Sequence, residues 1–352
     1  MKPLKVLLLS VMAFRKLAIE TRKMYRSIFR WANGEYHRLP ELAVDLVQHG
    51  ISVVVTSGGN AAAHAAKNAT TTIPIVSLVT DDPVRDGLVS SLAHPGGNLT
   101  GVNFLTTSLE SKRLQLLHEA VPRATKFAVL INPNNLLQSE IELRDVPAAS
   151  SLIGLQLTVF RASDVSGIDA AFAVMADQKI EALLVALDTF FFARRDQITR
   201  LAAHYALPAI YQLGEYAKAG GLMSYGTSLT DAYHQLGLQT ARVLKGAQPA
   251  TLPVMQSVKF ECVVNLKTAS DQKHAHPNRL PELRPRRCYL RDASARAHLL
   301  AVRTRRAHQE RQAGEVPLAG RRCKARAPRA LAGKLLVRLR WELPGRVFVP
   351  RR

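Results

Sequence analysis

The stretch from Val53 to Ala61 reads VVVTSGGNA, an apolar run that passes directly into two glycines and then into an alanine-rich segment. The apolar run is typical of a buried strand, and the alanines that follow favour a helix. The two glycines permit a tight turn between them. The stretch therefore predicts a strand, a turn and a helix in succession, which is the repeating unit of parallel α/β folds.

The same alternation continues along the chain. Apolar runs such as KFAVLIN at 126–132 and IEALLVAL at 180–187 are separated by segments with helical periodicity. The runs are apolar throughout, as sheets covered by helices on both faces require. About a dozen such units are too many for one compact sheet. We therefore predict an α/β fold with parallel sheets in two lobes that divide near 101–105.

The formal net charge of the 352 residues is +21, and it is unevenly distributed. Residues 1–269 carry 26 Lys and Arg against 21 Asp and Glu, whereas residues 270–352 carry 22 against 6. Hydrophobic periodicity also fades after 270, so we expect an irregular, Arg-rich tail there. Such a tail would bind nucleic acid only nonspecifically, through phosphates.

Composition and spacing disfavour several classes of protein. A hydrophobic content of 47% can supply substantial cores and argues against a disordered or fibrous chain. The three cysteines lack CxxC spacing, which disfavours a disulfide framework and a zinc site. No apolar run reaches the roughly 18 residues that a membrane-spanning helix needs. We expect neither a metal nor a cofactor.

In open parallel sheets, ligands bind beyond the carboxyl ends of the strands. The loops at these ends hold hydroxyls, amides, short carboxylates and aromatic rings, which suit the orientation of a small polar molecule. The residues predicted to contact this ligand are Thr56, Ser57, Gly58, Gly59, Asn60, Thr80, Asp81, Asn132, Asn134, Asp188, Tyr211 and Tyr225.

The glycine stretch matches none of three common motifs. It lacks the lysine of a P-loop, the spacing of GxGxxG and the upstream glycine of a nucleophile elbow around Ser57. Amide groups at the start of the following helix favour a carboxylate or another strong acceptor. The alternative is that Gly58 and Gly59 only permit the turn.

The other loops leave alternatives open as well. Asp81 either contacts an amine or hydroxyl of the ligand or belongs to a capped strand exit. Asn132 and Asn134 flank a proline and form a turn on conformational grounds alone. Asp188 ends an apolar strand and is predicted to point into the cleft. Aromatic residues at strand ends either form a wall of the ligand site or pack between the lobes.

No nucleophile with a matched base stands out, so we do not expect an enzyme.

Several stretches resemble one known family. They are TTTIPIVSLVTDDP at 70–83, AHPGGNLTGV at 93–102, KGAQPATLPV at 245–254 and KFECVVNLKTA at 259–269. Together they resemble the ABC transporter substrate-binding protein family related to the tryptophan- and tyrosine-uptake binding proteins. The resemblance covers about 29–269.

The resemblance implies a type I periplasmic-binding fold, in which two Rossmann-like lobes joined at a hinge close on a small molecule. It also implies a monomeric periplasmic binding protein, not an enzyme, that passes its solute to a permease driven by a separate ATPase. The expected division is an N-terminal lobe at 1–103 with an atypical first 28 residues, a C-terminal lobe at 104–225, shared crossing elements at 226–269 and the tail at 270–352.

The two ends depart from the family pattern. KVLLLS at 5–10 is read either as the first strand or as part of an export signal; without a signal the chain would stay in the cytoplasm. The tail has the composition expected of an out-of-frame reading of GC-rich coding sequence. The alternative function is a cytoplasmic ligand sensor or regulator whose basic tail contacts nucleic acid.

Overall fold

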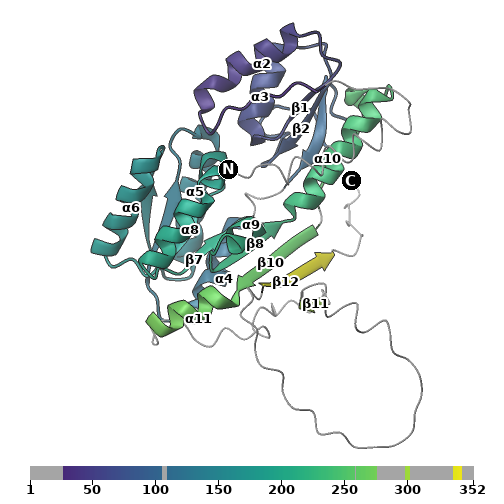
Figure 1. The fold of residues 1–352 in the computed structure, drawn as a ribbon. Helices are drawn as coiled ribbons and strands as arrows, with labels where there is room; N and C mark the ends of the chain where they lie inside the picture. Colours follow the sequence, from purple (N-terminus) through teal and green to yellow (C-terminus); the bar gives the residue numbers. More distant parts are fainter. Residues whose placement is uncertain (1–26, 105–108, 258, 276–297, 302–335, 343–352) are drawn as a thin grey trace, which may run out of the picture.

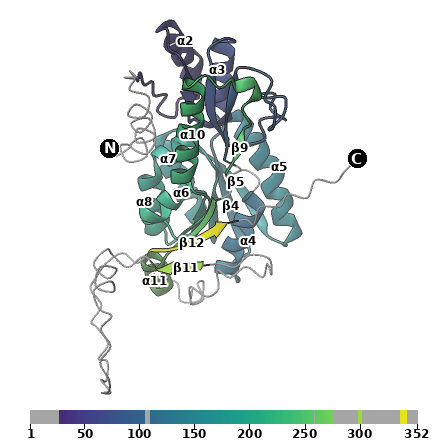
Figure 2. The same cartoon turned by 90° about the vertical axis from the view of Figure 1, so that its right-hand side faces the viewer.

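The computed structural model describes residues 27–104, 109–257, 259–275, 298–301 and 336–342 (Figure 1). These residues form two sheets with helices packed around them, one sheet beyond the other along the long axis of the molecule (Figures 1 and 2). KVLLLS at 5–10 lies outside the described residues.

The first sheet has the strand order β1-β2-β3-β9, and all of its pairs are parallel. Its strands are β1 (Val54–Thr56), β2 (Ile75–Val79), β3 (Leu99–Asn103) and β9 (Met255–Gln256). The elements around it are η1 (Tyr36–Arg38), α2 (Leu39–Gln48), α3 (Gly59–Ala69), α10 (Leu229–Leu244) and η3 (Pro249–Thr251). Strands β2 and β3 are buried along their whole length, as strands covered on both faces must be.

The second sheet has the order β11-β12-β10-β8-β7-β6-β4-β5. Its strands are β4 (Lys126–Ile131), β5 (Gln156–Arg161), β6 (Ala182–Val185), β7 (Ala209–Tyr211), β8 (Met223–Thr227), β10 (Lys259–Asn265), β11 (His298–Ala301) and β12 (Leu336–Glu342). Its helices are α4 (Glu110–Ala120), α5 (Leu136–Leu152), α6 (Val165–Asp177), α7 (Thr189–Ala193), α8 (Arg195–His204), α9 (Gly214–Lys218) and α11 (Leu266–Ala275). Strands β4 to β8 are parallel, whereas β10 runs antiparallel to β8.

Three chain segments connect the two sheets, and hydrogen bonds join them side by side. Ser257 N donates to Asn103 O at 2.9 Å, and Ser228 N donates to Lys259 O at 2.8 Å. The hydroxyl of Thr227 donates to Phe104 O at 2.5 Å. The chain therefore crosses between the lobes after β3, after β8 and after β9, and these bonds hold the crossings together.

The predicted α/β fold with parallel sheets of the type I periplasmic-binding class is confirmed, and VVVTSGGNA forms β1, a turn and the start of α3. One detail differs, because β10 enters the second sheet antiparallel. The boundaries drawn at 103, 225 and 269 stay a prediction. Ser270, where the tail was expected to begin, falls inside α11.

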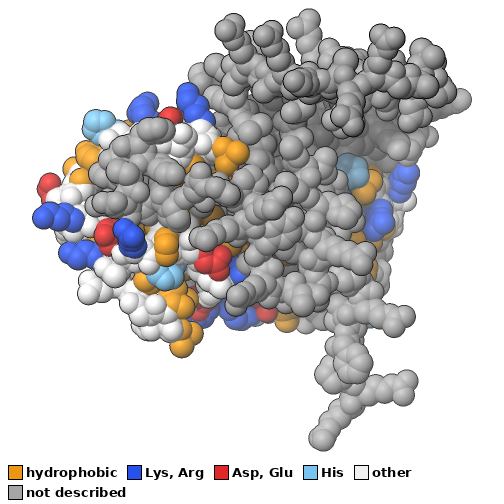
Figure 3. Space-filling model, turned by 90° about the horizontal axis from the view of Figure 1, so that it is seen from below, with side chains coloured by type: hydrophobic (Ala, Val, Ile, Leu, Met, Phe, Trp, Pro, Cys, Tyr) orange, Lys and Arg blue, Asp and Glu red, His pale blue; other side chains and the backbone are white. Residues whose placement is uncertain are grey.

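Charge on the described part of one face is mixed. In the view of Figure 3, Lys and Arg side chains lie beside Asp and Glu side chains. This agrees with the small net charge of residues 1–269, in which 26 basic residues nearly balance 21 acidic ones.

Candidate ligand-binding cleft

A cleft with about 760 Å³ of space free of atoms lies between the two sheets. Seven of the twelve residues predicted to contact ligand line it, namely Ser57, Gly58, Gly59, Asn60, Thr80, Asp81 and Asp188. Polar lining residues that the sequence did not single out are Tyr36, Asp86, Asn135, Gln138, Thr189 and Tyr233. The site therefore draws on both lobes.

The glycine turn opens the first helix onto the cleft. Gly59 has φ +73°, in the left-handed region, and a Cβ there would lie 3.2 Å from Thr80 Oγ1. Gly58 is the N-cap residue of α3 and has no side chain with which to cap it. The first backbone N–H groups of a helix have no partner within the helix, so here they are available to a ligand in the cleft.

Asn60 is buried at the same helix start, and its side chain is occupied within the protein. Its Oδ1 accepts from Thr80 N at 2.9 Å and from Asp81 N at 3.4 Å, while its Nδ2 donates to Asp86. Asn60 therefore fastens the loop after β2 to the start of α3.

Asp188 lies on the opposite wall and is only 4% exposed. Its Oδ1 accepts from Asn132 Nδ2 at 3.0 Å and from the backbone N–H groups of Phe190 at 2.9 Å and Phe191 at 3.1 Å. Its Oδ2 accepts from Tyr36 Oη at 2.6 Å and Asn135 Nδ2 at 3.0 Å. Asp188 thus caps α7 and holds five donors from three parts of the chain.

Tyr36 reaches this carboxylate from the segment before α2, on the side of the first sheet. Its hydroxyl also lies 2.8 Å from Thr189 Oγ1. Burial, followed by the charge of Asp188, raises the pKa of the Tyr36 hydroxyl. The hydroxyl therefore stays protonated and donates. No local pattern could have identified Tyr36, because its partners lie far along the chain.

The rest of the lining is largely apolar and aromatic. Phe192 and Leu213 come from the second lobe, and Leu78 and Tyr233 come from elements of the first. The Tyr233 ring is half-buried, and burial raises the pKa of its hydroxyl. An apolar ligand group would find matching side chains here.

Three predicted residues lie near the cleft without lining it. Thr56 Oγ1 is 2.6 Å from Ser77 Oγ and so ties β1 to β2. Asn132 points at Asp188, and its Oδ1 accepts from Asn134 N at 3.1 Å. Asn134 itself is exposed at the turn.

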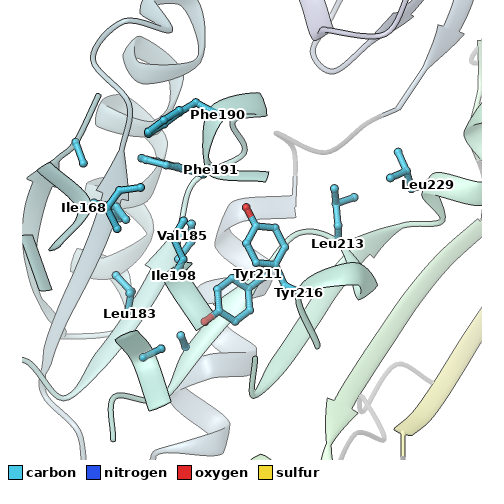
Figure 4. Close-up of a cluster of buried hydrophobic side chains, with 14 of the residues drawn as sticks. Ile168, Leu183, Val185, Phe190, Phe191, Ile198, Tyr211, Leu213, Tyr216 and Leu229 are labelled. Carbon is cyan, nitrogen blue, oxygen red and sulfur yellow. The ribbon is translucent and has the colours of Figure 1, made fainter. Parts of the chain in front are cut away.

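The two predicted tyrosines pack elsewhere. Tyr211 is fully buried, and its ring stacks on Tyr216 with centroids 4.6 Å apart (Figure 4). Tyr225 is partly buried and lies opposite Cys262 of the neighbouring strand β10. Tyr211 therefore belongs to the core of the second lobe, and Tyr225 packs against β10 instead of facing the cleft.

The described residues contain neither a metal-binding cluster nor a membrane-spanning helix. No group of three or more His, Cys, Asp or Glu residues in this part of the chain could hold a metal ion. None of its helices is both long and apolar enough to cross a membrane.

Two α/β lobes around a cleft define the architecture of a periplasmic binding protein. The chain belongs to the ABC transporter substrate binding protein family, whose model matches residues 11–283. This match is wider at both ends than the resemblance over 29–269. The family is a class of substrate-binding proteins and not a class of enzymes.

Known relatives agree with this assignment. The chain is 27% identical over 220 residues to the tyrosine-binding protein of Clostridioides difficile (strain R20291), a match over 61% of this chain and 62% of that relative. The chain thus spans less than two thirds of that relative's length.

Two solved structures share the fold. One is the ABC domain from Streptococcus pneumoniae in complex with L-Trp, with 24% identity, a TM-score of 0.65 and coverage of 76% of this chain and 90% of that one. The other is a conserved domain protein from Vibrio cholerae O1 biovar eltor strain N16961, with 22% identity, a TM-score of 0.67 and coverage of 79% and 92%.

Proposed function

We propose that the protein is the solute-binding component of an ABC-type import system and captures an α-amino acid between its two lobes. The observation that carries this proposal is the open start of α3, where residues from Ser57 to Ala61 line a cleft with apolar walls. Free backbone amides and the positive end of the helix dipole favour a carboxylate.

The opposite wall suits the rest of such a molecule. Phe192 and Leu213 offer aromatic and apolar surface for a side chain there, and Tyr233 adds an aromatic ring from the first lobe. The relatives support an aromatic amino acid, because one is named for tyrosine and another was solved with L-Trp. We extend that ligand class to this chain.

Binding would draw the lobes together. A ligand that touches α3 and the Asp188 wall at once makes its full set of contacts only when the lobes are closed, so it stabilises that state. The closed form would then deliver the solute to a permease and its ATPase in the periplasm, partners that family membership implies. The groups that line the cleft are hydrogen-bonding and apolar, as binding requires.

The test is a thermal-shift and calorimetric screen of the full chain. L-tyrosine, L-tryptophan and L-leucine would be compared with adenosine and succinate. We expect an aromatic amino acid to raise the melting temperature with increasing concentration. A shift with adenosine or succinate and none with any amino acid would refute the ligand class.

A charge placed at the start of α3 sharpens the test. Ser57→Asp would put a carboxylate beside the amides and is expected to abolish amino-acid binding. Ser151→Asp, at an exposed position away from the cleft, is the matched control and should bind as the unaltered protein does. Equal binding by both variants would argue against a carboxylate at α3.

A further inference from the structure

Side-chain amides on the second-lobe wall point their donors inward. Asn135, the N-cap residue of α5, donates through Nδ2 to Tyr36 Oη and Asp188 Oδ2, both at 3.0 Å. Gln138, one turn further along, donates through Nε2 to Glu142 Oε1 at 2.9 Å. Both amides line the cleft, and both have their N–H groups directed into the protein.

The side-chain amide of Gln138 is oriented so that its carbonyl oxygen faces the cleft. A primary amide is planar, with its oxygen and nitrogen on different sides of the carbonyl carbon. Because Nε2 is held by Glu142, Oε1 is the atom that faces away from that partner. No described residue donates a hydrogen bond to Oε1. The wall therefore presents an acceptor to a ligand.

Glu142 is suited to hold this amide in place. It is fully buried one helical turn after Gln138, and its Oε2 has no hydrogen-bond partner among the described residues. The charged groups beside it are Glu110 and Arg113 of α4. Arg113 pairs through Nε and Nη2 with both oxygens of Glu110.

The carboxylates that line the cleft already have partners within the protein. Asp188 accepts five hydrogen bonds from the protein. On the first lobe, Asp81 is paired with Arg85, and Asp86 accepts from Asn60. Each of these carboxylates is thus bound within the protein, whereas Gln138 Oε1 accepts no hydrogen bond from a described residue.

We propose that Gln138 accepts a hydrogen bond from the ammonium of the amino-acid ligand and that Glu142 is the positioning residue that fixes its amide. This inference rests on the proposed function and adds the direction of binding. The carboxylate lies at α3, and the ammonium lies at the start of α5. The neutral side-chain amide of Gln138, held in place by the buried Glu142, then provides the specificity for a primary ammonium.

The test compares two probes that differ only in the ammonium, L-tryptophan and 3-(indol-3-yl)propionate. Their dissociation constants would be measured by calorimetry on the full chain. Gln138→Leu should weaken L-tryptophan roughly tenfold, as expected for a lost hydrogen bond to a charged group, and leave the propionate unchanged. Gln115→Leu, at an exposed site on α4, is the control and should leave both constants unchanged.

Two variants of the acid test its positioning role. Glu142→Leu removes the acceptor for Gln138 Nε2 and should reproduce the selective loss of L-tryptophan binding. Glu142→Gln keeps a carbonyl acceptor and should restore it. If Glu142→Leu does not fold, the Gln138→Leu comparison alone decides.

Two outcomes overturn the inference and are distinguishable. If Gln138→Leu weakens both probes equally or weakens neither, the ammonium is recognised elsewhere, and the proposed function stands. If the unaltered chain binds no amino acid, the proposed function fails and this inference fails with it.

Discussion

At the scale of single residues, Glu142 is fully buried beside a second carboxylate, that of Glu110. Burial first, and then the carboxylate of Glu110, raise the pKa of Glu142 well above its ordinary value of 4.5, while Arg113 opposes the shift. Removing an unpaired carboxylate from water costs more than protonating it. Glu142 therefore binds its proton more tightly in the folded state than in the unfolded state.

This proton makes stability depend on pH in a known direction. A folded-state pKa above the unfolded value gives a stabilisation that is complete below the unfolded pKa and is lost as pH rises through the folded pKa. Glu142→Gln mimics the neutral acid at all pH values. As pH rises above 4.5 toward the folded-state pKa of Glu142, we expect the free energy of unfolding of Glu142→Gln, relative to the unaltered protein, to increase by roughly 1 kcal/mol per pH unit.

Urea unfolding at several pH values measures this difference. Glu119→Gln, at an exposed position on α4, is the control and should follow the unaltered protein across the range. If the difference in free energy of unfolding between Glu142→Gln and the unaltered protein did not change with pH, Glu142 would be ionised in the folded protein.

Asp188 offers a second comparison, between two N-cap aspartates. Asp188→Ala removes the acceptor of five donors, two of which are backbone N–H groups of α7. Asp164→Ala removes the exposed cap of α6, which accepts from Gly167 N and Ser166 Oγ. We expect a loss of about 2–4 kcal/mol for the first and a clearly smaller loss for the second, measured by urea unfolding. If both substitutions lowered the free energy of unfolding equally, the buried donors that bind Asp188 would have formed hydrogen bonds with other acceptors.

At the scale of elements, the close approach of β8 to β7 depends on Gly226. A Cβ at this position would lie 2.0 Å from Gln212 O, which is backbone and has no room to move. Gly97 has ordinary φ, and a Cβ there would meet nothing within 4 Å. Comparing alanine substitutions at Gly226 and Gly97 therefore separates the steric cost of a Cβ that meets backbone from the general cost of adding a methyl group.

We expect Gly226→Ala to destabilise the protein by about 3 kcal/mol or more, because strands β7 and β8 must separate to admit the methyl group. Gly97→Ala should stay within about 0.5 kcal/mol of the unaltered protein. Thermal unfolding followed by circular dichroism measures both. If Gly226→Ala had only a small effect on stability, the ends of β7 and β8 near the crossing segments could separate at little cost.

The sequence predicts those elements whose determinants are local. VVVTSGGNA predicts a strand, a turn and a helix because the apolar run, the two glycines and the first alanine of the helix lie within nine residues. The direction of Tyr211 was not predictable, because a short strand covered on both faces shows no alternation of apolar and polar residues. Tyr36 and Gln138 reach the cleft through tertiary contacts. Tyr36 meets Asp188 across 152 positions of sequence, which no periodicity reports.

At the scale of the whole molecule, Tyr36 joins the two lobes across the cleft. Its segment precedes α2, which packs on α3 beside the first sheet, while Asp188, Thr189 and Asn135 belong to the second lobe. These bonds can form only when the lobes are close together. Tyr36 therefore favours the closed arrangement whatever ligand lies between the lobes.

Tyr36→Phe keeps the ring and removes the hydroxyl. Apparent affinity scales with the population of the binding-competent state, so the variant should weaken L-tyrosine and L-tryptophan by the same factor, roughly 2- to 10-fold for the net worth of a hydrogen bond. Tyr205→Phe, on a ring that stacks on Phe172 within the second lobe, is the control and should leave both constants unchanged. Small-angle X-ray scattering of the ligand-free protein should show a larger radius of gyration for Tyr36→Phe alone. Unequal losses for the two ligands, with no change in the radius, would instead make Tyr36 a direct ligand contact, because only a shift in lobe closure acts on every ligand alike.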